Sequence, residues 1–195
     1  MPAYSIEARS FSIALAWCHN FWVLKNADGS TIAELHGLAY DRINHTILPI
    51  GTTKDHALRV FVFPHDTAYA ARLRLATGST RMYWRSRARV VYQGEDGLAR
   101  WSAAVAAMPL LDELDLTYPP FGFNLRTPTI NSNSAYRTFG EIMDVPVHDF
   151  SRALGPGLRN RMMSASAIDS AKFRADRDAT LAAAAVRADG APVRA

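Results

Sequence analysis

A short polar segment between two apolar runs near the N-terminus indicates how this part of the chain folds. The runs Phe21–Leu24 and Ile32–Leu35 flank a segment that contains Asp28 and Gly29. An Asp-Gly pair in this position is typical of a β-hairpin, because both central residues of a type I′ turn need a positive φ. The sequence therefore predicts two antiparallel strands joined at Asp28 and Gly29.

The remaining apolar pattern places strands in the first half of the chain and helices in the second. Strands are expected over Tyr4–Trp17, Leu58–Phe63, Tyr83–Trp84 and Val90–Tyr92. Helices are expected over Gly97–Leu114 with Asp96 as N-cap, from Asn131 to a stop at Pro146, and over Ala165–Ala188. This order predicts one α+β domain over residues 1–188, with an antiparallel sheet and packed helices, and a frayed tail over residues 189–195.

Composition narrows the class of protein. The 195 residues are 49% hydrophobic and 21% charged, which fits a globular domain and excludes disordered and collagen-like chains. No apolar run reaches the roughly 18 residues that cross a bilayer, so no membrane span is expected. Glu7 and Arg9 precede the first apolar stretch, unlike a signal peptide, which leaves a cytoplasmic protein or one exported without a cleaved leader. The single cysteine, Cys18, excludes an internal disulfide, and the histidine spacing fits no metal site, so no metal ion or cofactor is expected.

The predicted hairpin brings two histidines together. A two-residue turn places Phe21 opposite His36, and His19 then shares a face with His36 because alternate residues of a strand point the same way. The imidazoles would start roughly 5–8 Å apart, within reach of one hydrogen bond. Such a pair can act as a general base with its orienting partner, or it can be purely structural. A three-residue turn would instead pair His36 with Asn20 and separate the histidines.

The second candidate group lies at the start of the helix predicted after Asn131. Residues Asn131–Ser134 are all suited to helix capping, and capping alone explains their presence. In a functional interpretation, the Ser132 hydroxyl lies on the first helical turn, where free backbone N–H groups can stabilise an oxyanion. Serine needs a base to lose its proton, and His19 is the candidate.

Together these segments resemble the circularly permuted papain-fold proteins, which include the permuted NlpC-type amidases and the lecithin–retinol acyltransferase-like enzymes. In that family a histidine begins one strand, a second polar residue lies on the next strand, and the nucleophile begins a much later helix. Cys18–Val23 resembles the histidine strand, Glu34–Gly37 the next strand, and Asn131–Met143 the nucleophile helix, with Ser in place of the usual Cys. The resemblance covers roughly Trp17 to Met143.

The resemblance implies a hydrolase or acyltransferase that acts on an amide or ester bond of a peptide, peptidoglycan or lipid, such as a bacterial effector amidase. Ser132 would be the nucleophile, His19 the general base and His36 the orienting residue. Four residues are expected to bind the substrate, the first of which also shapes the helix start: Asn131, Asn133, Trp22 and Phe121. With Ser in place of Cys, three possibilities remain. The protein is a slower serine hydrolase, its site only binds a ligand, or Ser stands where the natural protein has its catalytic cysteine.

Two alternatives remain open. A cysteine enzyme would use Cys18 with His36, whereas His19 could not activate Cys18 because neighbours on a strand face opposite ways. Alternatively, the chain is a non-catalytic binding or effector protein that keeps the fold.

A basic segment bears on the second alternative. No acidic residue lies between Thr67 and Gly94, whereas six arginines do: Arg72, Arg74, Arg81, Arg85, Arg87 and Arg89. The spacing places the last three on one strand face, which is either solvated or binds a protein partner or an anionic surface. No recognised nucleic-acid-binding module is present, so no specific nucleic acid is expected.

Overall fold

A six-stranded antiparallel sheet forms the centre of the protein. The computed structural model describes residues 3–13, 17–150, 155–174 and 177. The strands are β1 (Tyr4–Ser12), β2 (Cys18–Lys25), β3 (Thr31–Asp41), β4 (Thr46–Leu48), β5 (His56–Pro64) and β6 (Arg87–Gly94). Their order is β4-β3-β2-β1-β6, and β5 pairs with β3.

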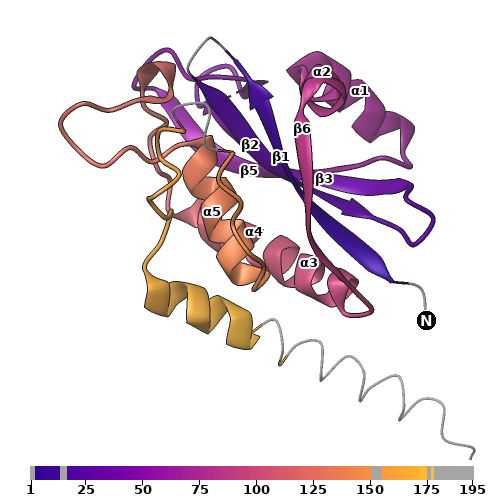
Figure 1. Ribbon diagram of the computed structural model, residues 1–195. Coiled ribbons are helices and arrows are strands. Elements are labelled where there is room, and N and C mark those ends of the chain that lie inside the picture. The colour runs from indigo at the N-terminus through magenta and orange to yellow at the C-terminus, as the bar shows by residue number, and fades with distance from the viewer. Residues whose placement is uncertain (1–2, 14–16, 151–154, 175–176, 178–195) are drawn as a thin grey trace, which may run out of the picture.

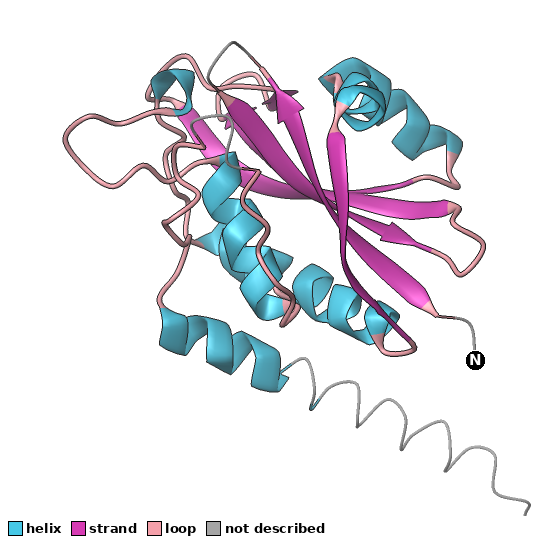
Figure 2. Cartoon of the chain, in the orientation of Figure 1, coloured by secondary structure: helices cyan, strands magenta, loops and turns pink. Residues whose placement is uncertain are grey.

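Helices follow or interrupt these strands and confirm the predicted α+β class (Figure 2). They are α1 (Ala68–Thr77), α2 (Ser79–Arg85), α3 (Gly97–Ala106), α4 (Met108–Glu113), the 3₁₀ turn η1 (Pro120–Gly122) and α5 (Ser132–Ile142). Residues 165–174 are also helical, whereas residues 178–188 of that predicted helix and the predicted tail lie outside the described residues. Within the described residues, no helix is long and apolar enough to cross a bilayer.

Helices cover both faces of the sheet (Figure 1). On one side, here called the α5 face, Trp22 and Leu35 pack in one core with Phe139 of α5. On the opposite side, the α2 face, Phe21 and Phe63 pack with other apolar side chains, including two from α2. Because Phe21 and Trp22 are consecutive strand residues, β2 supplies both cores by simple alternation.

The hairpin register follows the prediction, although its loop does not. Trp22 pairs with Leu35 and Leu24 with Ala33, as a two-residue turn requires. The register then shifts by one residue at Lys25, and the loop closes through a hydrogen bond from the Asn26 N–H to the Ser30 carbonyl. The register of the paired strands is therefore confirmed despite the irregularity next to the loop.

The strand predicted at Tyr83 and Trp84 is wrong. Tyr83 and Trp84 lie in helix α2 rather than in a strand, because burying Tyr83 against the sheet outweighs its preference for extended structure. Arg85 therefore ends a helix and does not share a strand face with Arg87 and Arg89.

The helix predicted over Gly97–Leu114 is divided into α3 and α4. Pro109 lies in the first turn of α4, where its ring and missing N–H interrupt a continuous helix. Asp96 occupies the N-cap position of α3 but makes no capping hydrogen bond through its side chain. Its carboxylate instead accepts hydrogen bonds from Tyr92 and Arg100.

Candidate functional site

The two histidines of the hairpin are hydrogen-bonded, as the register predicts. His19 Nε2 lies 2.9 Å from His36 Nδ1, and His36 Nε2 lies 2.8 Å from Glu34 Oε2. Glu34 reaches His36 because residues two apart on a strand share a face. All three side chains are buried on the α2 face, where the His36 ring stacks on Phe21 at 4.4 Å between centroids. We call this hydrogen-bonded chain the Glu34–His36–His19 relay.

Side chains from three other segments surround the Glu34 carboxylate. His65 Nε2 lies 2.6 Å and Arg74 3.2 Å from Oε1, and the Ser79 hydroxyl donates to Oε2 at 2.7 Å. Burial by itself raises the pKa of Glu34, but hydrogen bonds from His36, His65 and Ser79 outweigh it and hold the pKa well below its usual range. Glu34 is therefore ionised at neutral pH.

An ionised Glu34 fixes the position of one proton on His36. The carboxylate can only accept, so His36 donates from Nε2; when the His36 ring is neutral, its Nδ1 accepts and His19 donates from its own Nε2. His19 Nδ1 then carries a lone pair, and this buried atom has no hydrogen-bond partner. Burial, followed by the charge of a protonated His36, lowers the pKa of His19 well below its usual value, which keeps the ring neutral.

Unpartnered polar groups concentrate at this end of the sheet. Among the described residues, six buried side-chain atoms lack a partner, and four of them are Ser10 Oγ, His19 Nδ1 and both amide atoms of Asn20. Ser10 pairs with Asn20 across β1 and β2 and shares its face, whereas His19, next to Asn20 on β2, points to the opposite face of the sheet. Buried polar groups are normally satisfied by protein or water. His19 Nδ1 on the α2 face is therefore separate from the unpartnered atoms of Ser10 and Asn20 on the α5 face.

Ser132 lies on the other side of the sheet from the relay. A Cβ added to Gly37 would come within 2.4 Å of Ala135 Cβ and 3.4 Å of Ser132 Cα, so α5 packs on the Gly37 side of β3. His36, the preceding residue, points the opposite way. The buried Ser132 hydroxyl accepts a hydrogen bond from Tyr118 at 3.5 Å. The structure thus brings His19 to His36 but does not bring Ser132 to either histidine.

The two asparagines at the start of α5 are occupied in holding the fold. Asn131 caps the helix through its Oδ1, and its Nδ2 donates to the carbonyls of Gly122 and Pro156 at 2.7 and 2.9 Å. The Asn133 amide accepts from the Asn20 N–H at 3.0 Å and donates to the Cys18 carbonyl at 3.1 Å. Asn133 thereby substitutes for a neighbouring strand beside β2, and neither expected substrate contact is free.

The other predicted residues separate into buried and accessible ones. Trp22 is a core residue, not a substrate contact: its ring stacks on Tyr136, and its Nε1 donates to the Tyr136 carbonyl at 2.8 Å. Phe121 is 59% exposed and remains accessible to a ligand. Cys18 is buried, and burial raises the pKa of its thiol, so it is not the thiolate that a cysteine enzyme requires.

Glu34 is the member of the relay that the sequence pattern did not single out as a candidate. Its position two residues before His36 was the available signal, because that spacing puts a carboxylate beside an imidazole on the same strand face. His65, Arg74 and Ser79 come from distant segments, and no local pattern points to them.

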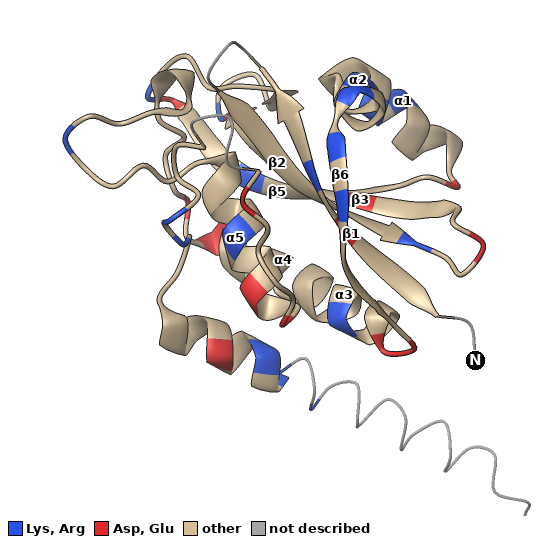
Figure 3. Ribbon diagram, in the orientation of Figure 1, with Lys and Arg blue, Asp and Glu red and all other residues tan. Residues whose placement is uncertain are grey.

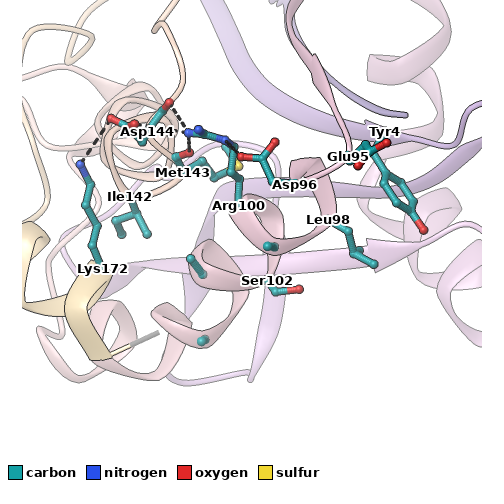
Figure 4. Close-up of a pocket in the computed structure, with 13 residues that line it drawn as sticks. Tyr4, Glu95, Asp96, Leu98, Arg100, Ser102, Ile142, Met143, Asp144 and Lys172 are labelled. Carbon is teal, nitrogen blue, oxygen red and sulfur yellow. Dashed lines mark hydrogen bonds and ion pairs between the residues drawn. The ribbon is translucent and has the colours of Figure 1, made fainter. Parts of the chain in front are cut away.

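One cavity lies away from the relay. It has a volume of about 970 Å³ and is lined mainly by α3, the end of α5 and Lys172 (Figure 4). Its charged groups pair with one another: Arg100 contacts Asp96 and Asp144 at 2.9 and 3.3 Å, and Lys172 lies 3.8 Å from Asp144. In the described part of the chain, no group of three or more His, Cys, Asp or Glu residues could hold a metal ion.

No family model, no curated protein and no solved structure matches this chain.

Proposed function

We propose that this chain is a hydrolase of the permuted papain-like type that cleaves an amide or ester bond, with His19 as its general base. The observation that carries the proposal is the buried relay whose last atom, His19 Nδ1, has no hydrogen-bond partner. A base oriented by a second group, itself oriented by a carboxylate, is the arrangement that general-base catalysis uses.

The order of elements supports the family assignment within this proposal. The histidine begins β2, its partner lies on β3, and the much later α5 has a polar N-terminus that bonds the backbone of β2 through Asn133. The substrate would be a peptide, peptidoglycan or lipid, as the resemblance implies.

Water is the nucleophile that this geometry favours, because Ser132 lies across the sheet from His19. The water oxygen would attack the carbonyl carbon while one of its protons moves to His19 Nδ1, and the C=O π electrons would move to the oxygen. The bond to the leaving nitrogen or oxygen would then break as the C=O re-forms, and the leaving group would take the proton back from His19. The hydrogen bond to His36, and through it the charge of Glu34, would stabilise the transient imidazolium.

The test compares hydrolysis by three variants across p-nitrophenyl esters and peptidoglycan stem peptides. We expect His19→Gln to lower kcat/KM at least 100-fold, since a positioned base contributes roughly 10²–10⁴-fold. Ser132→Ala and the matched control His148→Gln should retain activity. Because the pKa of His19 is lowered, the rate should stay level from neutral into mildly acidic pH and fall only at lower pH.

Three outcomes would overturn this mechanism. Absence of turnover on every substrate by the unmodified protein, or full activity in His19→Gln, would reject His19 as a catalytic base. Loss of activity in a folded Ser132→Ala variant would assign the nucleophile to Ser132 and reject the direct attack by water.

A further inference from the structure

A small cavity lies on the α2 face, next to the relay. It has a volume of about 390 Å³ and is lined by the end of β1 and by α2, through Phe11, Ser12, Ile13, Arg81 and Arg85. We call it the Arg81–Arg85 recess. Phe11 is the direct cross-strand partner of His19, so the recess is one strand away from the relay.

Two uncompensated positive charges face this recess. Arg81 and Arg85 are four residues apart on α2, which puts their guanidinium groups on the same side of the helix, where like charges repel. Both side chains are exposed, and neither makes an ion pair or hydrogen bond with any residue in the described ranges. Arg9 and Arg74, on the same face, are instead bound to carboxylates.

The surrounding surface strengthens this positive potential. No acidic residue occurs between Thr67 and Gly94, and Figure 3 shows Lys and Arg over α2 and β6 without Asp or Glu. Clustered charge of one sign raises the local concentration of the opposite ion. The position of Arg85 in the last turn of α2 is explained by the helix dipole, but that dipole does not explain Arg81.

The opposite wall of the recess is apolar. Phe11 is half-buried and packs against the core of the α2 face, and Ile13 is 43% exposed. Ser12, between them, is exposed and carries a hydroxyl that can donate one hydrogen bond. The recess therefore combines cationic donors on one side with an apolar surface on the other.

We propose that the Arg81–Arg85 recess binds a phosphate or carboxylate group that is attached to an apolar chain. Guanidinium groups bind such oxyanions through pairs of parallel N–H donors, which a single lysine ammonium cannot offer. The apolar chain of the ligand lies against Phe11 and Ile13. A lipid headgroup and a free phosphate ester share this chemistry, and the site does not depend on a catalytic role for His19.

The experiment measures binding to the full chain by isothermal titration calorimetry. Octyl phosphate, used below its micelle-forming concentration, is the probe, and octanol and inorganic phosphate are its uncharged and chain-less counterparts. We expect octyl phosphate to bind more tightly than either, and the double variant Arg81→Gln/Arg85→Gln to weaken its binding at least tenfold. The matched control Arg72→Gln/Arg89→Gln removes the same charge outside the recess and should weaken binding less than threefold.

Each result decides the proposal. Absent binding of octyl phosphate, or equal binding by both double variants, would reject the recess as the binding site. Equal affinity for inorganic phosphate would reject a contribution of the apolar wall to binding. Vesicles that contain phosphatidic acid distinguish the two sources of the ligand. If the unmodified protein is retained on the vesicles and Arg81→Gln/Arg85→Gln is not, the ligand is a lipid headgroup. If the unmodified protein is not retained, the ligand is a free ester. His19→Gln should bind octyl phosphate normally, so failure of the catalytic proposal would leave this one intact.

Discussion

Replacing Glu34 with Gln removes the charge at the first member of the relay while preserving the size of the side chain. The two carboxylate oxygens receive hydrogen bonds from four side chains: His36, His65, Arg74 and Ser79. A Gln amide replaces one acceptor oxygen by an NH₂ group with two donors, so this group must face hydrogen-bond donors wherever it is placed. The substitution therefore leaves buried polar groups unsatisfied in either orientation.

The expected loss of stability in Glu34→Gln follows from the burial of the carboxylate and its partners. Removing one partner of a buried ion pair costs about 3–5 kcal/mol, mainly because the other charge is left uncompensated. The side chains of Arg74 and His65 are 13% and 18% exposed, so water can partly solvate them after the change. We therefore expect the lower end, a loss of about 3 kcal/mol in the free energy of unfolding.

Urea unfolding followed by tryptophan fluorescence measures this loss. The matched control is Glu113→Gln, an exposed carboxylate at the end of α4, which should change the free energy of unfolding by about 0.5 kcal/mol or less. A loss below about 1 kcal/mol in Glu34→Gln would refute the reasoning, because it would mean that the buried carboxylate is not needed to satisfy its donors.

Two further predictions concern pH and packing. The free energy of unfolding should fall as pH drops below 6.5, because His19 in the unfolded chain binds a proton that the folded protein excludes. It should fall more steeply below pH 4.5, because Glu34 in the unfolded chain then binds a proton as well. Urea titrations across pH check this, and His19→Gln should flatten the first decline. Gly37→Ala should cost about 1–3 kcal/mol, because its Cβ would lie 2.4 Å from Ala135 Cβ. Gly155→Ala, whose nearest contacts are at 3.6 Å, should leave the thermal midpoint nearly unchanged, and equal melting of both variants would contradict the packing argument.

Local geometry accounts for what could be predicted from sequence. The pairing of Trp22 with Leu35 and the contact between His19 and His36 follow from a hairpin whose strands alternate with a period of two residues. The start of α5 at Ser132 follows from the capping preference of Asn131. Each of these features depends on residues that are close in the chain, so their spacing carries the information.

Contacts between distant segments decided the rest. Whether α5 packs on the Gly37 side or the His36 side of β3 depends on which sheet face its apolar surface covers, and residue spacing alone does not distinguish the two. That choice separates Ser132 from His19. The partners of Glu34 arrive from three other segments for the same reason: a buried charge is satisfied by whatever donors the packed chain brings to it. Residue spacing within the hairpin thus accounts for the histidine pair, whereas packing between distant segments selects the groups that surround it.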